Sequence, residues 1–229
     1  MKRFTLFLLL LSVVCWADTA GPGSGTAADD GSASCNAADW ATKTNLGASD
    51  NAYATCTILS ISVSDKLYIS SLGFSVPGGS TINGISVTYE RKCASTSSCS
   101  TDTANGAYVS VTKTAGTPVG TNKGTATTWT SSDVTDTWGN ASDKWGTTWT
   151  PAEINASGFG MATIVYNSAG VSRLASIDYL AVTVDYTPAA GINMGRRVII
   201  SGWNPREKAS CWRAGEQWRC AQTRARARG

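Results

Sequence analysis

The sequence predicts an all-β protein, folded as an antiparallel β-sandwich of jelly-roll type. Charged residues make up only 15% of the 229-residue chain. β-branched residues recur throughout and strong helix formers are few, which favours strands. Short alternating runs of apolar and polar residues are separated by turn signals, at a spacing typical of sandwiches and barrels.

Five segments carry the clearest strand pattern. They are residues 67–76, 82–92, 107–114, 158–167 and 176–187. In the second, Ile85, Val87 and Tyr89 point to one face of the sheet, because side chains alternate along a strand. The Pro-Gly-Gly at 77–79 forces a chain reversal before it. Residues 151–157 predict a single helical turn that begins with a proline.

The first 17 residues match a secretory signal peptide. Lys2 and Arg3 precede an apolar run, and the small residue Ala17 suits the cleavage site. The run is shorter than the ~20 residues that span a bilayer. We therefore expect a secreted protein, extracellular or on the cell surface, with no transmembrane segment after the signal is removed.

The expected sandwich domain, residues 40–188, lies between two segments of different composition. Residues 18–39 are mostly small and polar, which predicts a flexible arm. Residues 189–229 form a basic extension rich in Cys, Trp and Arg. From residue 188 onward the net charge is +7, so the preceding part of the chain carries −4.

Within the extension, the run CWRAGEQWRC is nearly symmetrical and predicts a hairpin. Trp212 would face Arg219, and Arg213 would face Trp218, as cross-strand aromatic–guanidinium pairs. The arginines could bind an anionic partner, or the negatively charged sandwich domain of a neighbouring subunit. The extension could equally be a solvated or incidental appendage. Export does not favour nucleic acid as the partner.

The cysteines predict disulfides. Removal of the leader takes away Cys15 and leaves six: Cys35, Cys56, Cys93, Cys99, Cys211 and Cys220. Six cysteines allow 15 pairings, of which short loops favour Cys93–Cys99 and Cys211–Cys220 and leave Cys35–Cys56. A zinc site is the alternative, but paired CxxC spacing and histidine are both missing. We expect no metal and no cofactor.

The composition excludes several catalytic classes. Without histidine the chain cannot build Ser-His-Asp or Cys-His machinery, and no nucleophile elbow, P-loop or dinucleotide motif is present. A glycosidase pair of carboxylates is the remaining enzymatic alternative. Its candidates are Glu90, Asp136, Asp143, Glu153, Asp178 and Asp185. We expect these acids to lie on solvated strand faces and turns, and the protein not to be an enzyme.

Residues 128–150 hold the richest local cluster, with Asp-x-Trp-Gly at 136–139 and again at 143–146. Its tryptophans are Trp129, Trp138, Trp145 and Trp149. Exposed, they would form a stacking platform for a glycan; buried, they would fill the core, as tryptophan usually does. A calcium loop through Asp136, Asn140 and Asp143 is a third interpretation, but it lacks the known ligand rhythm.

Four blocks of the sequence resemble a known β-sandwich module. They are LGFSVPGGSTINGISVTYERK, GTPVGTNK, DKWGTTWTPAEINASGFGMAT and ASIDYLAVTVDYTP. In this order they resemble a module of bacteriophage tail and virion structural proteins and of bacterial surface proteins, over roughly residues 40–188. Trp145, Trp149 and Asp178 match its aromatic and final-strand positions. The resemblance implies a structural or adhesive module and brings no catalytic residues.

The chain departs from that module in its export signal, its six mature cysteines and its basic tail. These departures favour a protein on the surface of, or released by, a bacterium. The expected function is therefore a non-catalytic structural or assembly subunit of an extracellular filament, an envelope layer or a virion appendage. Its expected partners are further copies of itself or neighbouring surface proteins. Carbohydrate binding or adhesion through the tryptophans is the alternative.

Overall fold

A computed structural model describes residues 17–94 and 98–189, together with the backbone of two strands at 209–214 and 217–222. The chain forms two compact units, Met1–Ala190 and Gly191–Gly229. In the described part of the chain, no helix has the length and apolar character needed to cross a membrane.

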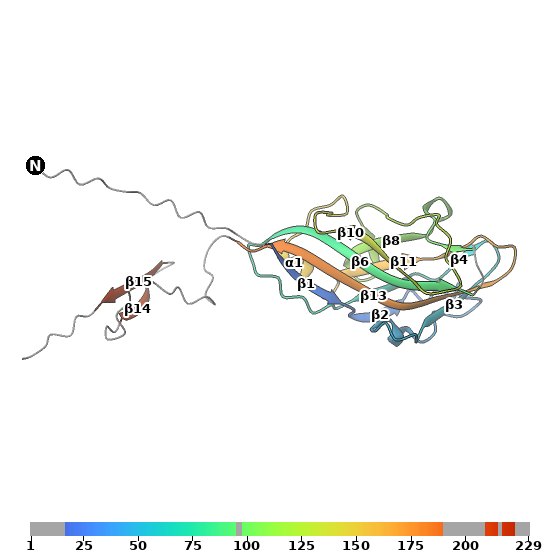
Figure 1. Cartoon of the computed structure of the whole chain (residues 1–229), viewed down its shortest axis with the longest axis horizontal. Helices are drawn as coiled ribbons and strands as arrows, with labels where there is room; N and C mark the ends of the chain where they lie inside the picture. Colours follow the sequence, from blue (N-terminus) through green and yellow to red (C-terminus); the bar gives the residue numbers. More distant parts are fainter. Residues whose placement is uncertain (1–16, 95–97, 190–208, 215–216, 223–229) are drawn as a thin grey trace, which may run out of the picture. The chain divides into compact units, whose positions relative to one another are not determined.

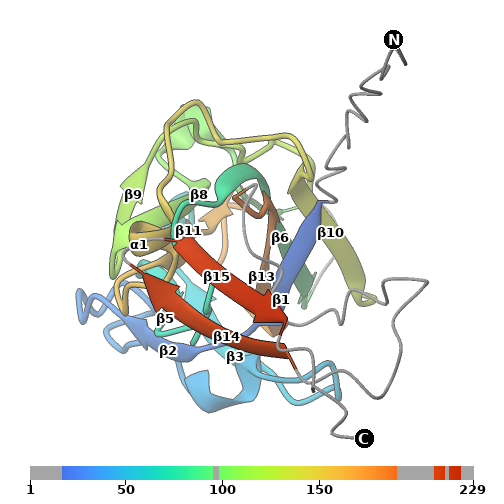
Figure 2. The ribbon, with the colours of Figure 1, turned by 90° about the vertical axis from the view of Figure 1, so that its left-hand side faces the viewer.

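The first unit contains two large antiparallel sheets (Figure 1). One has the order β1 (Asp18–Gly23), β13 (Arg173–Thr187), β6 (Thr81–Cys93), β10 (Val134–Asn140), and β3 (Ala54–Ile58) pairs with the beginning of β13. The other has the order β2 (Thr26–Asp29), β5 (Leu67–Ser70), β11 (Gly160–Ile164), β8 (Tyr108–Thr114), β9 (Thr117–Val119). Figure 2 shows the first sheet on the right and the second on the left.

Short elements complete this unit. A small third sheet has the order β4 (Ser62–Val63), β12 (Tyr166–Asn167), β7 (Cys99–Ser100). The helical turns are η1 (Lys43–Leu46), η2 (Thr103–Asn105) and α1 (Pro151–Ile154). α1 lies where the proline at position 151 predicted it, and a capping box between Thr150 and Glu153 fixes its start.

The core lies between the two large sheets. Ile85, Val87 and Tyr89 of β6 are fully buried, as the alternating pattern predicts. They belong to one hydrophobic cluster with side chains from the second sheet, including Val111 and Met161. The predicted all-β, sandwich-like fold is therefore confirmed, because two layers share one core; the jelly-roll topology stays a prediction.

The predicted strands are found with two changes of boundary. The strand expected over 67–76 ends at Ser70, and the next residue, Ser71, has a φ of 56°. The strand expected over 158–167 is divided at Val165 into β11 and β12. β6, β8 and β13 agree with their predicted ranges to within a few residues.

Residues 18–39 differ from the expected flexible arm, because they belong to the sandwich. β1 pairs with the end of β13, and β2 pairs with β5. Small side chains suit these strands because their backbone lies very close to its neighbours. A Cβ on Gly21 in β1 would meet the carbonyl oxygen of Val182 at 2.6 Å, and one on Gly25, between the two strands, would overlap the carbonyl of Ser70. Ladder hydrogen bonds require no large side chain, so composition alone was misleading.

Two of the three expected disulfides are confirmed, Cys35–Cys56 and Cys93–Cys99. In the second unit, β14 (Ala209–Ala214) and β15 (Gln217–Gln222) form the predicted hairpin. Their register places Cys211 opposite Cys220, Trp212 opposite Arg219 and Arg213 opposite Trp218. The third predicted disulfide and the aromatic–guanidinium contacts concern side chains outside the described ones.

Candidate functional site

The four candidate tryptophans do not form an exposed platform. Trp129, Trp145 and Trp149 are 1%, 0% and 8% exposed and belong to the core cluster. Trp138 is half-buried against Tyr89, with ring centroids 5.2 Å apart. The indole N–H of Trp145 donates to the Ile85 carbonyl at 2.9 Å, so this polar edge is satisfied internally. The core interpretation therefore describes these residues better than the glycan interpretation.

The carboxylates of the two Asp-x-Trp-Gly repeats form ion pairs with basic side chains of the protein. Asp136 accepts from the Arg91 guanidinium at 2.8 Å, and Asp143 lies 2.6 Å from the Lys123 ammonium. Burial raises the pKa of Asp143, but Lys123 and the Trp145 N–H outweigh it and hold the pKa below its usual range. The Asn140 side chain instead accepts from Ser142. The side chains of all three residues of the suggested calcium loop therefore have partners within the protein, and their positions require no bound ion.

Of the six candidate glycosidase acids, the structure brings Glu90 and Asp178 near each other on the adjacent strands β6 and β13. Register pairs Glu90 with Tyr179, next to a bulge at Asp178. Asp178 is only 1% exposed, and its Oδ2 accepts the N–H of Asn51 at 2.9 Å. This acid therefore holds the adjoining loop in place. Glu153 pairs with Lys113 at 2.7 Å, whereas Asp185 lies in the β1–β13 ladder.

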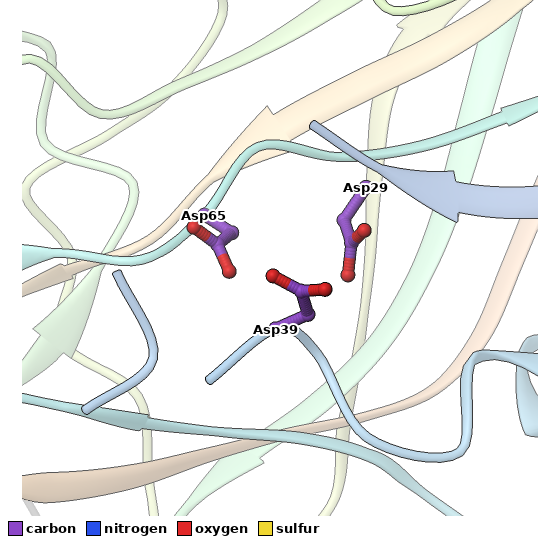
Figure 3. A group of neighbouring side chains, drawn as sticks. All are labelled: Asp29, Asp39 and Asp65. Atoms are coloured by element: carbon purple, nitrogen blue, oxygen red, sulfur yellow. The ribbon is translucent and has the colours of Figure 1, made fainter. Parts of the chain in front are cut away.

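A different group of acids converges. Asp29 ends β2, Asp39 lies in the loop before η1, and Asp65 precedes β5. One carboxylate oxygen from each lies within 4.8 Å of those of the other two, and Figure 3 shows the three groups facing a common space. Asp65 is fully buried, Asp29 is half-buried and Asp39 is exposed.

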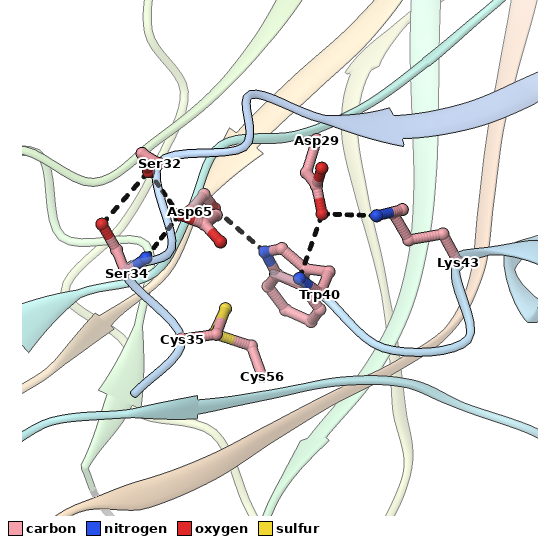
Figure 4. Close-up of polar contacts among 8 residues, drawn as sticks. All are labelled: Asp29, Ser32, Ser34, Cys35, Trp40, Lys43, Cys56 and Asp65. Atoms are coloured by element: carbon pink, nitrogen blue, oxygen red, sulfur yellow. Dashed lines mark hydrogen bonds and ion pairs between the residues drawn. A yellow bond between two sulfur atoms is a disulfide. The ribbon is translucent and has the colours of Figure 1, made fainter. Parts of the chain in front are cut away.

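A polar network holds this group in place (Figure 4). Asp65 Oδ1 accepts from the Ser34 N–H at 2.7 Å and from the Ser32 hydroxyl. The indole N–H of Trp40 donates to the Asp65 carbonyl at 2.9 Å. The backbone N–H of Trp40 donates to Asp29 Oδ2 at 3.0 Å. The network thus connects the chain before Trp40 with the approach to β5.

The acidic group had only a weak signal in the sequence. Ala-Ala-Asp occurs at 27–29 and again at 37–39, in a stretch of small polar residues. Asp65 is far from both in the chain. Only the pairing of β2 with β5 brings Asp29 close to it. The prediction of a flexible arm over residues 18–39 placed neither Asp29 nor Asp39 in the fold, so this arrangement was not expected.

An apolar surface occupies one end of the sandwich. Its members are all the large hydrophobic side chains that are exposed in the described part of the chain: Leu59 (45%), Ile61 (67%), Val171 (54%) and Leu174 (38%). We call this set the apolar tip. Leu59 and Ile61 lie in the loop between β3 and β4, Val171 lies in the loop between β12 and β13, and Leu174 lies at the start of β13. The two loops are joined by the N–H of Ile61, which donates to Ala169 O at 3.1 Å.

A buried amide organises the apolar tip. Asn167 is 0% exposed. Its Nδ2 donates to the carbonyls of Ile58, Leu59 and Val171 at 3.1, 2.9 and 2.9 Å. One side chain therefore fixes both loops, so the exposed apolar groups are held in defined positions.

The tip lies far from the C-terminal end of β13. β13 begins beside the tip and runs 15 residues to Thr187, which at ~3.3 Å per residue is roughly 46 Å. Asp18, at the beginning of β1, pairs with Tyr186 near the end of β13. Asp18 and Thr187, the first and last strand residues of the sandwich, therefore lie at the end opposite the tip (Figure 1).

No model of a known protein family matches the chain, and no curated protein matches it in sequence. The resemblance to phage and surface-protein modules thus stays a prediction, and the function is argued from the geometry.

Proposed function

We propose that this protein is a secreted, non-catalytic structural subunit that self-assembles outside the cell into a filament, an envelope layer or a virion-type appendage. One observation carries the proposal. The four exposed large hydrophobic side chains of the described part of the chain all lie on two short segments, 59–61 and 171–174, and hydrogen bonds from Asn167 join these segments. Scattered exposed hydrophobics are ordinary, whereas clustered ones mark interaction surfaces.

The tip is suited to binding because hydrogen bonds from Asn167 already hold its backbone in place. Contacts made by preordered loops avoid much of the entropy lost when flexible loops become fixed. Ile61 has a φ of 49°, a left-handed backbone that is strained for a β-branched residue. A strained and exposed isoleucine is poorly explained by the stability of the isolated subunit. It is well explained by a contact with another subunit.

The arrangement of the ends favours head-to-tail assembly. The tip is at one end of the sandwich, and Asp18 and Thr187 lie at the other. A contact between two different surfaces repeats from copy to copy, and it forms an open filament when the rotation does not close into a ring. The geometry therefore fits a subunit that contributes one surface at each end.

Three further observations support a secreted, non-enzymatic role. Cys35–Cys56 and Cys93–Cys99 are disulfides, which persist in oxidising compartments. The acids of the tryptophan repeats are paired with cations. The tryptophans that would bind a glycan are mostly buried, so the carbohydrate-binding alternative would need a different surface.

The test is the association state of the mature, disulfide-bonded protein, measured by light scattering after size-exclusion chromatography. Ile61→Asn removes the most exposed apolar side chain and places there a residue that tolerates the left-handed conformation. Burial of an isoleucine contributes about 1.5–3 kcal/mol. We therefore expect self-association to weaken about tenfold or more, with the thermal midpoint unchanged or raised.

Ser71→Asn is the matched control, because Ser71 is also exposed, also has a positive φ (56°) and lies outside the tip. It should associate like the unmodified protein. A protein that stays monomeric at every concentration would refute self-assembly. Equal weakening by both variants would refute the role of the tip.

A further inference from the structure

We infer that Asp29, Asp39 and Asp65 form a calcium-binding site that fastens the N-terminal part of the chain onto the sandwich. The inference is independent of self-assembly. It also differs from the expectation, based on the sequence, that the protein binds no metal.

The spacing of the carboxylates fits one ion. Calcium binds oxygen ligands at about 2.3–2.6 Å, so two ligands on opposite sides of it lie at most about 5 Å apart. The three ligand oxygens lie within 4.8 Å of one another. In Figure 3 they approach the same point from three different segments of the chain.

A second observation points to a ligand. Asp65 is 0% exposed, and its Oδ2 is buried with no hydrogen-bond partner. Its Oδ1, by contrast, has two donors, the Ser34 N–H and the Ser32 hydroxyl. Leaving a buried carboxylate oxygen without a partner is costly. A cation among the three acids would satisfy this oxygen.

Charge and donor chemistry identify the ion. Lys43 lies 2.6 Å from Asp29 and offsets one of the three negative charges, so the group has a formal charge of −2, which suits a divalent cation. The nearby sulfur atoms of Cys35 and Cys56 are joined in a disulfide, which leaves oxygen as the donor type. Asp39 is exposed, so water can complete the six to eight ligands of calcium.

The ion would connect three segments. Asp29 belongs to β2, Asp39 to the loop that follows and Asp65 to the approach to β5. The disulfide between Cys35 and Cys56 ties the same loop to β3. Calcium would thus act beside the disulfide as a second fastening of the loop.

The mature, disulfide-bonded protein is titrated with terbium, a luminescent substitute for calcium, with excitation through tryptophan. Trp40 contacts both Asp29 and Asp65, so bound terbium should emit strongly, and added calcium should displace it. Extracellular calcium modules bind with dissociation constants of about 10⁻⁴–10⁻³ M. At roughly 10 mM calcium the thermal midpoint should then rise by about 3–10 °C.

Two variants test the assignment. No hydrogen bond or ion pair to Asp39 occurs within the described residues, so Asp39→Asn should fold normally while its calcium affinity falls about tenfold or more. Asp65→Asn places an amide donor among acceptors. It should raise the midpoint without calcium and abolish the rise with calcium.

Asp102→Asn is the matched control, because Asn caps a helical turn as well as Asp does and Asp102 lies outside the acidic group. It should keep the full calcium response. The inference is overturned if the unmodified protein shows neither sensitised emission nor a calcium-dependent midpoint. It is equally overturned if Asp39→Asn responds as the unmodified protein does, or if Asp102→Asn loses the response.

Discussion

Asp178 shows how a single buried acid connects loop structure to pH. Burial raises the pKa of this carboxyl above its ordinary value, and the carboxylates of Glu90 and Asp50 raise it further, while the N–H of Asn51 acts in the opposite direction. Its Oδ1 is buried without a partner. The folded protein therefore binds the Asp178 proton more tightly than the unfolded chain does.

Asp178 should consequently make the protein less stable as the pH rises. A raised folded-state pKa contributes stability that is fully present below the unfolded pKa, about 3.9, and is lost as the pH rises through the folded value. Asp178→Asn keeps an oxygen acceptor for Asn51 and cannot ionise. Chemical denaturation at a series of pH values should show the variant gaining stability relative to the unmodified protein from about pH 4 upward.

Glu153→Gln is the control of opposite sign. The Lys113 ammonium holds the pKa of Glu153 below its usual range, so its contribution is present above the unfolded pKa and is lost in acid. Gln can still complete the capping box with Thr150. The variant should lose relative stability as the pH rises. If the difference in stability between Asp178→Asn and the unmodified protein does not depend on pH, the pKa of Asp178 is not raised in the folded protein.

At the scale of elements, the two tip loops depend on Asn167 in β12. Its amide donates to carbonyls on both loops, and its Oδ1 accepts the N–H of Ala169 at 2.9 Å. Neither loop pairs as a long strand, so this side chain replaces ladder hydrogen bonds. The order of the exposed surface is thus set by one buried residue.

Asn167→Leu has a similar size and removes all of these bonds. At about 0.5–1.5 kcal/mol for each of the four lost bonds, we expect the free energy of unfolding to fall by about 2–6 kcal/mol. Hydrogen exchange should show faster exchange of the Ile61 amide. Asn155→Leu breaks a comparable bridge, to Val76, outside the tip. It should leave the Ile61 amide unchanged; equal acceleration in both variants would contradict the local role of Asn167.

The sequence predicted the elements whose own side chains carry the pattern. The alternation of β6 and β13 is visible because both strands have buried faces, and the proline at position 151 marks α1. β1 and β2 were missed because they are held by backbone pairing and close contact, for which small residues are selected. β10 was missed because it lies inside the cluster rich in Trp, Asp and Gly at 128–150.

The candidate sites were less predictable because they depend on long-range contacts. Trp145 was named as a candidate glycan-stacking residue, but it is fully buried, and the Ile85 carbonyl that accepts its indole N–H is 60 positions away in the chain. The group of Asp29, Asp39 and Asp65 exists only because β2 pairs with β5. The tip combines two segments, 59–61 and 171–174, that are distant in the chain, so hydropathy along the sequence does not reveal it.

At the scale of the whole molecule, the charge is strongly divided. Residues 18–187 contain 8 Lys and Arg against 14 Asp and Glu, a net charge of −6, while residues 188–229 carry +7. The first unit contains all of the described core residues and both disulfides. A chain that ends after residue 188 should therefore keep its fold but lose the positive charge of the extension.

This division predicts an ionic contribution to assembly that can be separated from the apolar one. Trimming residues 189–229 should leave the thermal midpoint unchanged and weaken self-association at low salt. Added salt should weaken the self-association of the full chain in the same way, because at about 1 M it shortens the screening length to about 3 Å. Ile61→Asn, in contrast, should weaken association at every salt concentration, since apolar contacts are not screened. Sedimentation of the three proteins across a salt series distinguishes the two contributions. If the trimmed chain associates as strongly as the full chain at low salt, the basic extension has no part in the contact, and the tip alone must hold the subunits together.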